Sequence, residues 1–391
     1  MRRGLMVLCY LVALGAAPAF AADEPDTADV GPSLEYRPPR PILPEPRGAT
    51  PAPPVTIFRD IIGGFGIGRG SFDKPADVAI GNDGRTYVLD AGNNRIQMFN
   101  KKNDFVLEWG SQGDDQWGQF KNPTAIFVVP GTCDVVLVLD TGNNRLQWFS
   151  VPCTGDPGEK LPNLPLGHAG SYIRNGDLFG DYGIADGKFD KPLDLTFVKS
   201  NVARFPFGLL IVSTFWLLDA GNERVQQCSF TIDPRSPWEM ACSEVFSNLT
   251  GDRGSLKGLV SLAWSHEESF DYLYLLGTGC SIQKFKFTAG NLEDFRRKLP
   301  VLDETWPAVA PESGLCVPAR VRYDERKQYL YVLDSGNSLL SIFHRNGNYI
   351  SALRGAARTF DRPGGFAFRP ESGDFAVADT GNDLVQKFTL R

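Results

Sequence analysis

Val88-Leu-Asp-Ala-Gly-Asn-Asn-Arg-Ile-Gln-Met-Phe99 is the first copy of a phrase that recurs along this 391-residue chain. The copies start at intervals of tens of residues, and in the fourth, a worn copy, glycine replaces the aspartate. The others are Val138–Phe149, Leu217–Cys228, Leu275–Phe285 (the worn copy), Val332–Phe343 and Val377–Phe388. Such a period identifies a repeat array. The repeat predicts an architecture, but it names no ligand or reaction.

Each copy predicts a β-hairpin. In the first, alternating apolar residues lead to Asp90, a turn at Gly92-Asn-Asn94 follows, and Arg95–Phe99 alternates again. Glycine and asparagine tolerate the positive φ that such turns need. One strand precedes the hairpin (Ala76–Ile80) and another follows it (Phe105–Trp109). Four antiparallel strands per unit, repeated radially, predict an all-β fold of propeller blades.

An aspartate and an arginine flank the turn in the first three copies. Such a pair can lock the hairpin and hydrogen-bond the neighbouring loop, and repeated polar residues in an array usually maintain the repeat. In the last two copies leucine replaces the arginine, which a catalytic pair would tolerate poorly. We therefore expect a structural role for Asp90 and Arg95, Asp140 and Arg145, and Asp219 and Arg224.

The two ends of the array predict how the ring closes. The sequence reaches Arg391 just after the third strand of the last unit, and a blade of three strands would have an open edge prone to aggregation. Residues 55–62 (Val-Thr-Ile-Phe-Arg-Asp-Ile-Ile) predict a strand that precedes the first unit. We therefore predict a six-bladed β-propeller of four-stranded antiparallel blades over residues 55–391, with residues 55–62 as the outer strand of the last blade.

A family resemblance supports this fold. The phrases Phe72-Asp-Lys-Pro-Ala-Asp-Val-Ala-Ile80 and Tyr87–Phe99 closely resemble NHL repeats. The resemblance is strong in the first two units, good in the third, fifth and sixth, and poor in the fourth. NHL proteins include binding scaffolds and a few enzymes, so the resemblance implies a fold and little about function.

The N-terminal residues predict export. Residues 1–21 resemble a cleaved signal peptide, with Met1-Arg-Arg as the positive start, an apolar run over Leu5–Ala17 and Ala19-Phe-Ala21 at the cleavage site. The run is too short for a transmembrane span. Residues 22–54 are rich in proline and predict an extended, disordered linker. We expect a secreted or periplasmic protein. Export and a net charge of −6 argue against nucleic-acid binding.

Six cysteines remain after removal of the leader, an even number that suggests disulfides in an exported chain. The predicted strand register places one pair side by side across the second hairpin, and a turn at residues 233–237 places another pair face to face. The third pair follows by elimination and joins a hairpin turn to the next connector. Buried free thiols are the alternative. The expected bonds are Cys133–Cys153, Cys228–Cys242 and Cys280–Cys316.

Polar residues recur where the innermost strands begin, at a position that we expect near the mouth of the axial channel: Asp77, Asp194, Ser261 and Arg320. Three interpretations stay open. Arg320 can pair with Asp77 or Asp194, because buried charges are usually paired. Arg320 can instead hold a small carboxylate or other polar ligand. The two aspartates can also bind calcium, although calcium takes 6–8 oxygen ligands and two carboxylates make a weak case.

Motifs of enzymes are scarce. The three histidines, His168, His266 and His344, are widely separated, which disfavours a zinc lyase or hydrolase. The sequence contains no nucleophile-elbow or triad-like phrase.

We therefore expect a monomeric binding scaffold, without a cofactor, that takes a protein or glycan partner on the face of hairpin turns and connectors. Long loops on a rigid ring favour recognition, and we interpret Cys153–Gly187, Asn201–Phe207 and Asn291–Gly314 as such insertions. Trp238 and Trp306 are candidate anchors or caps of neighbouring blades. The alternatives are loops without a partner, and a lyase or hydrolase that uses the channel mouth with bound calcium.

Overall fold

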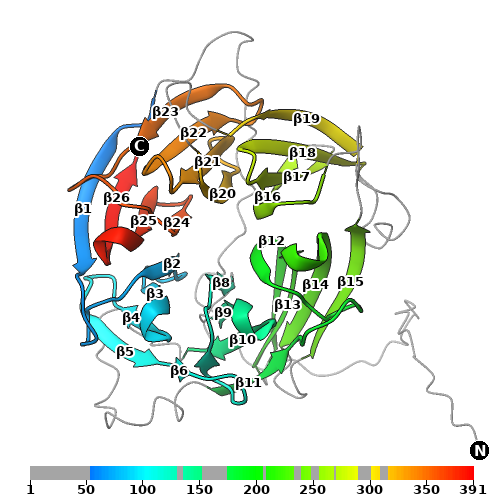
Figure 1. The fold of residues 1–391 in the computed structure, drawn as a ribbon, viewed down its shortest axis with the longest axis horizontal. Helices are drawn as coiled ribbons and strands as arrows, with labels where there is room; N and C mark the ends of the chain where they lie inside the picture. Colours follow the sequence, from blue (N-terminus) through cyan, green and yellow to red (C-terminus); the bar gives the residue numbers. More distant parts are fainter. Residues whose placement is uncertain are drawn as a thin grey trace, which may run out of the picture. The chain divides into compact units, whose positions relative to one another are not determined.

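The structure, a computed structural model, describes residues 53–129, 135–151, 174–205, 208–232, 239–247, 255–267, 270–288, 301–308 and 316–391. Within these ranges the strands form six four-stranded antiparallel sheets around an axis (Figure 1). The prediction of a six-bladed propeller is confirmed. No helix among the described residues is long and apolar enough to cross a membrane. The expected signal peptide, residues 22–52 of the linker, Cys133, Cys153, His168 and Trp238 lie outside the described residues.

Each of the first three blades runs in chain order from the axis outward. Blade 1 consists of β2 (Pro75–Ile80), β3 (Thr86–Asp90), β4 (Arg95–Phe99) and β5 (Phe105–Trp109). Blade 2 consists of β8 (Ala125–Val129), β9 (Val135–Asp140), β10 (Arg145–Ser150) and β11 (Arg174–Phe179). Blade 3 consists of β12 (Pro192–Phe205), β13 (Gly208–Asp219), β14 (Arg224–Ile232) and β15 (Glu239–Ser247). Between blades 1 and 2, the short strands β6 (Ser111–Gln112) and β7 (Gln119–Phe120) pair in parallel.

Blades 4 and 5 repeat this plan. Blade 4 consists of β16 (Leu259–Glu267), β17 (Phe270–Gly277), β18 (Ser281–Thr288) and β19 (Val301–Pro307). Blade 5 consists of β20 (Pro318–Asp324), β21 (Tyr329–Asp334), β22 (Leu339–His344) and β23 (Tyr349–Leu353).

Blade 6 joins the two ends of the propeller. Its strands are β24 (Gly365–Arg369), β25 (Asp374–Asp379), β26 (Leu384–Leu390) and, outermost, β1 (Thr56–Gly63). In Figure 1, β1 (blue) lies beside β26 (red). The Val55 amide donates to the Arg391 carbonyl at 2.8 Å, and the Arg391 amide donates back at 3.0 Å. The predicted closure by residues 55–62 is confirmed, with the strand one residue further along.

The hairpin turns are short 3₁₀ turns in four blades: η1 (Ala91–Asn93), η2 (Thr141–Asn143), η4 (Ala220–Asn222) and η7 (Thr380–Asn382). In the first, Asn94 adopts the predicted left-handed conformation with φ of 51°. Gly92 does not, so that part of the prediction is wrong. Glycine is required there for another reason: a Cβ atom on Gly92 would lie 2.5 Å from the Asp73 carbonyl oxygen.

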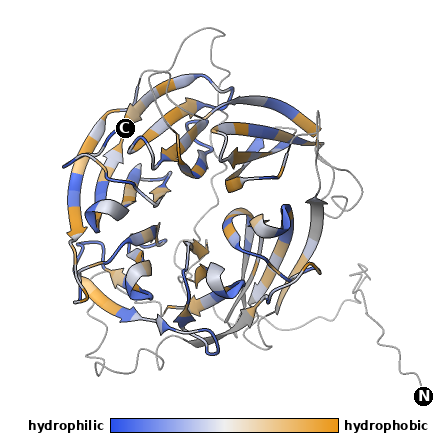
Figure 2. Cartoon of the chain, in the orientation of Figure 1, coloured by the Kyte–Doolittle hydropathy of each residue, from blue (hydrophilic) through white to orange (hydrophobic). Residues whose placement is uncertain are grey.

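The apolar side chains of neighbouring blades pack against each other. Between blades 1 and 2, Leu89 and Ile96 belong to one buried cluster with Ile126 and Val138. The rings of Trp109 and Phe149 lie 5.6 Å apart in the same cluster. Figure 2 shows hydrophobic and hydrophilic residues mixed along the strands. Because each blade is covered on both faces, burial of a large apolar side chain contributes about 1.5–3 kcal/mol at each such position.

The three expected loop insertions need correction in part, because each of them contains residues of a strand. Residues 201–205 continue β12 and pair with β13 as far as Phe205 opposite Gly208, so blade 3 is widened by a longer hairpin. The range 291–314 contains β19, and the range 153–187 contains β11. Both are outer strands. Trp306 lies in β19 and packs edge-on against Tyr274 with ring centroids 6.2 Å apart, so it covers the blade.

Candidate functional site

The four polar residues expected at the channel mouth are all buried. Asp77, Asp194, Ser261 and Arg320 expose 1%, 0%, 0% and 6% of their surface. Each of them is the third residue of the innermost strand of its blade. The register between this strand and the second strand shifts between the first residue and the third. A β-bulge of this kind redirects a side chain and releases backbone amides from the ladder.

Asp194 is paired with an arginine that sequence reasoning did not select. Arg322 Nη1 lies 2.8 Å from Asp194 Oδ2, and Nη2 lies 3.0 Å from Oδ1. Ser261 Oγ and the Leu262 amide also donate to Oδ2. The guanidinium lies 5.4 Å from the centre of the Phe127 ring. Burial lowers the pKa of Arg322, but the adjoining Asp194 carboxylate outweighs burial and raises that pKa above its ordinary value.

Arg320 extends from blade 5 to blades 1 and 2. Its Nη2 lies 3.7 Å from Asp77 Oδ2 and donates to the Thr124 carbonyl at 2.5 Å. Asp77 accepts hydrogen bonds from the Val78 amide at 2.9 Å and the Ile126 amide at 3.1 Å. Burial raises the pKa of Asp77 from 3.8 to about 6, against the opposing effects of Arg320, Arg322 and the two amides. The Nε atom of Arg320 is buried and has no hydrogen-bond partner among the described residues.

These contacts define an axial cluster of Asp77, Asp194, Ser261, Arg320 and Arg322. Arg320 lies beside Asp77, one of the two partners expected for it. Arg322 pairs with Asp194, the other expected partner. The sequence signal for Arg322 was its position two residues after Arg320, because this spacing places both side chains on one face of β20. Each of the four carboxylate oxygens accepts from at least one protein donor. The described residues contain no group of three or more side chains suited to a metal ion.

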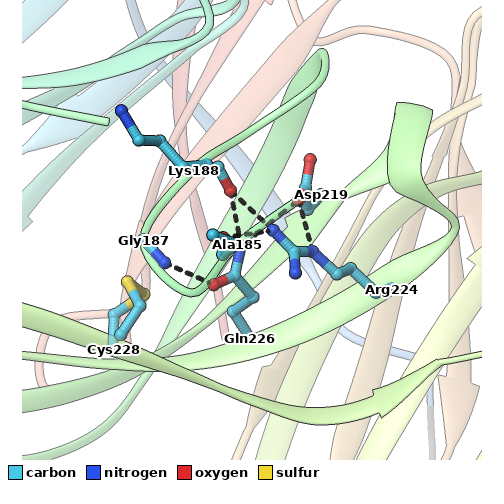
Figure 3. The surroundings of a disulfide bond; sticks show 8 residues. Ala185, Gly187, Lys188, Asp219, Arg224, Gln226 and Cys228 are labelled. Carbon is cyan, nitrogen blue, oxygen red and sulfur yellow. Dashed lines mark hydrogen bonds and ion pairs between the residues drawn. A yellow bond between two sulfur atoms is a disulfide. The ribbon is translucent and has the colours of Figure 1, made fainter. Parts of the chain in front are cut away.

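A second arrangement lies at the hairpin turn of blade 3 (Figure 3). The Arg224 Nε donates to Asp219 at 2.7 Å, while its Nη2 donates to the carbonyls of Ala185 and Lys188 in the preceding connector at 3.0 and 2.7 Å. Gln226 accepts from the Gly187 amide at 3.0 Å and donates to the Lys188 carbonyl at 2.9 Å. We call this set of aspartate, arginine and glutamine the clasp, because it fixes the connector on the turn.

The clasp recurs in blades 1 and 2 with the same geometry. Its members there are Asp90, Arg95 and Gln97, and Asp140, Arg145 and Gln147. The structural role expected for the three Asp–Arg pairs agrees with these contacts. The glutamine was missed, although it stands two residues after the arginine in every copy of the phrase that has one. In blade 6, Asp379 and Gln386 keep part of the arrangement without an arginine.

Residues 72–99, which contain the first clasp, match the model of the NHL repeat. The chain is a six-bladed β-propeller that contains an NHL repeat. It is 31% identical over 81 residues to the protein brain tumor of Drosophila melanogaster, a match that spans 21% of this chain and 8% of that protein.

The chain is also similar in fold to solved propellers. The aldose sugar dehydrogenase of Streptomyces coelicolor is 12% identical with a TM-score of 0.49, over 88% of this chain and 100% of that one. The virginiamycin B lyase of Staphylococcus aureus is 13% identical with a TM-score of 0.42, over 86% of this chain and 98% of that one.

Hydroxyl groups on the turns connect neighbouring blades of the propeller. The Thr141 hydroxyl of blade 2 donates to the Pro192 carbonyl of blade 3 at 2.6 Å, and the Thr380 hydroxyl of blade 6 donates to the Pro75 carbonyl of blade 1 at 2.7 Å. Ser335 connects blade 5 to Pro363 of blade 6 in the same way. Blades 1 and 3 have alanine at this position, Ala91 and Ala220, and alanine offers no hydroxyl.

Asp77 and Asp194 accept hydrogen bonds across the two blade boundaries that follow Ala91 and Ala220. Asp77 of blade 1 accepts from the Ile126 amide of blade 2, and Asp194 of blade 3 accepts from the Leu262 amide of blade 4. Ser261 of blade 4 accepts from the Val321 amide of blade 5 at 2.9 Å. The axial polar residues therefore connect blades where the turns of blades 1 and 3 have no hydroxyl to do so.

A disulfide also crosses the boundary between blades 4 and 5. Cys280, in the turn of blade 4, is bonded to Cys316, in the connector of blade 5, with Cα atoms 6.1 Å apart. Cys280 has the left-handed conformation of Asn144 in blade 2, whose side chain accepts from the Lys191 amide of the next connector at 2.8 Å. Between blades 4 and 5 the disulfide therefore stands where Asn144 forms a hydrogen bond between blades 2 and 3. The expected pairs Cys280–Cys316 and Cys228–Cys242 are confirmed.

Proposed function

We propose that this NHL propeller is an exported scaffold that binds a protein partner through its face of hairpin turns and connectors. The supporting observation is that the clasps hold three connectors by hydrogen bonds while the tips of two of them expose apolar side chains. Phe65 and Ile67 are 79% and 83% exposed, and Tyr182 and Ile184 are 69% and 81% exposed. A rigid loop loses little entropy on binding, and exposed aliphatic side chains suit a protein partner better than a glycan.

The axial cluster supports a structural use of the channel rather than catalysis. Arg322 and Asp194 form a two-point ion pair, and Arg320 lies beside Asp77. Groups that satisfy each other in this way lose their pairing energy if they turn to a substrate. The proposed function needs no cofactor.

Photo-cross-linking in cells that make the protein tests the binding face. A photoreactive amino acid at position 184 lies on the face of connectors, whereas one at the exposed Asn346 lies in the turn between β22 and β23 on the opposite face. We expect a discrete protein adduct from position 184 and none from position 346. Equal adducts from both positions, or none from either, would contradict the assignment of this face. Deletion of residues 154–186 is no substitute, because it removes β11.

A further inference from the structure

The connectors that enter blades 1, 2 and 3 are equivalent residue by residue. In each, the turn asparagine donates to a glycine carbonyl: Gly66 at 3.0 Å, Gly113 at 2.9 Å and Gly183 at 2.8 Å. The clasp arginine then donates through Nη1 to the carbonyl of the next residue, at 2.8, 3.0 and 2.6 Å respectively. The side chains on either side of the glycine can therefore be compared directly.

At these two positions blade 2 differs in kind from its neighbours. Blade 1 carries Phe65 and Ile67, and blade 3 carries Tyr182 and Ile184. Blade 2 carries the polar residues Gln112 and Asp114 instead. Both blade 2 side chains are exposed, as is Asp115. The same backbone thus presents an apolar pair, an acidic tip and a second apolar pair on three successive blades. We call this set the three-tip surface.

Folding does not explain the apolar tips. The clasps act through backbone carbonyls and amides, so any side chain at these positions leaves their hydrogen bonds intact. Most aromatic side chains of the described chain are buried in the blades, and Phe72, which forms a bridge with Phe65, is fully buried. Exposed apolar groups gathered on one face are typical of an interaction site.

The acidic tip selects the kind of partner. Asp114 and Asp115 are exposed and form no ion pair with a described residue, so both side chains are accessible to a ligand. A bilayer with anionic lipids would be repelled by carboxylates held between the apolar tips. A protein segment with lysine or arginine between two apolar positions matches the surface in both charge and apolar character.

We propose that the three-tip surface binds a protein segment whose apolar residues contact blades 1 and 3 and whose basic residues contact Asp114 and Asp115. This inference rests on the proposed function and deepens it, because it names the residues and the chemistry of the partner. Sheets pack about 10 Å apart, so blades 1 and 3 are separated by roughly 20 Å where they pack. An extended segment of about seven residues covers that distance.

Selection from a phage-displayed library of random 20-residue peptides on the complete mature protein provides the test. We expect enriched peptides with basic residues between apolar ones. Their affinity is then measured by calorimetry for the wild type, for I67S/I184S, for D114N/D115N and for V301S. Val301 is a matched control, since it is 66% exposed but lies in β19 of blade 4. We expect a loss of about tenfold or more in I67S/I184S, a weaker salt dependence in D114N/D115N, and no change in V301S.

Three outcomes would overturn the inference. Peptides that bind I67S/I184S as tightly as the wild type place binding elsewhere on the scaffold and leave the proposed function standing. Failure to enrich any peptide rejects the segment as the ligand, and a missing cross-link from position 184 then rejects the proposed function as well. Binding of the wild type, but not of I67S/I184S, to vesicles of phosphatidylcholine and phosphatidylglycerol assigns the tips to a membrane surface instead.

Discussion

Replacement of Arg322 by methionine tests whether the axial cluster holds the ring together. The substitution R322M keeps an unbranched side chain of similar length and removes the guanidinium. Asp194 then stays fully buried and, among the described residues, retains only Ser261 and the Leu262 amide as donors. Removal of one member of a buried ion pair costs about 3–5 kcal/mol, because the remaining charge stays uncompensated.

The free energy of unfolding measured in urea should fall by this amount. A domain of about 340 residues has an unfolding entropy of about 0.7 kcal/mol/K, so the melting temperature should fall by about 4–7 °C. The matched control is R326M on the same blade. Arg326 has a side chain that is 59% exposed and lies 3.9 Å from Glu371, and a surface pair of this kind contributes about 0–1 kcal/mol.

The double variant D194N/R322M separates lost charge pairing from lost packing. With both charges removed, the asparagine can still accept from the Leu262 amide, so the double variant should be more stable than R322M alone. The reasoning is refuted if R322M loses no more stability than R326M. It is equally refuted if D194N/R322M is less stable than R322M, because the two losses would then be independent.

Three further predictions follow from the site. The pKa of Asp77 rises from 3.8 unfolded to about 6 folded, so its contribution to stability is complete below pH 3.8 and is lost as pH rises through about 6. Between pH 4 and 7 the wild type should therefore lose about 2.4 kcal/mol relative to D77N in urea titrations, and a constant difference would contradict this. The bond Cys280–Cys316 closes a separation of 36 residues, so C280S/C316S should lose about 3.8 kcal/mol by chain entropy. C228S/C242S, with a separation of 14 residues, is the comparison and should lose about 3.0 kcal/mol; the opposite order would count against the entropic account. In R224M, Asp219 stays buried without its cation, so stability should fall by about 3–5 kcal/mol and amide exchange at Gly187 should accelerate; unchanged exchange would show that the clasp does not fix the connector.

The repeated phrase predicts most of the fold because it specifies local structure six times. Alternating apolar residues before Asp90 and after Arg95 define two strands of blade 1, and the open edge left at Arg391 requires residues 55–62. The outer strands were harder to recognise. β19 has mostly exposed and intermediate positions, so its sequence resembles a loop.

The axial cluster was predictable only in part. The spacing after the connector prolines selects Asp77, Asp194 and Arg320, and the equivalent place in blade 4 selects Ser261. The pairing of Arg320 with Asp77 was among the expected ones. Whether a side chain from blade 5 reaches blade 3 depends on the width of the ring and on the length of arginine, which no local pattern reveals. That is why Arg322 was missed.

The exposed tips escaped prediction for a related reason. Phe65 and Ile67 stand in a glycine-rich connector, where apolar residues normally indicate burial. Only the hydrogen bonds from Asn93 and Arg95 show that the backbone faces inward at this point.

The pairing of β1 with β26 has a consequence for the rate of unfolding. If the chain began and ended at a boundary between blades, the ring could open by separating two packed faces. In this propeller, opening the ring at blade 6 also requires β1 to separate from β26 at seven paired positions, from Thr56 opposite Leu390 to Gly63 opposite Leu384. An interaction that must break before the ring opens raises the barrier to unfolding and so prolongs the lifetime of the native state. A circular permutant that joins Arg391 to Val55 and starts between β23 and β24 would have six contiguous blades, and it should unfold faster than the natural chain at equal stability.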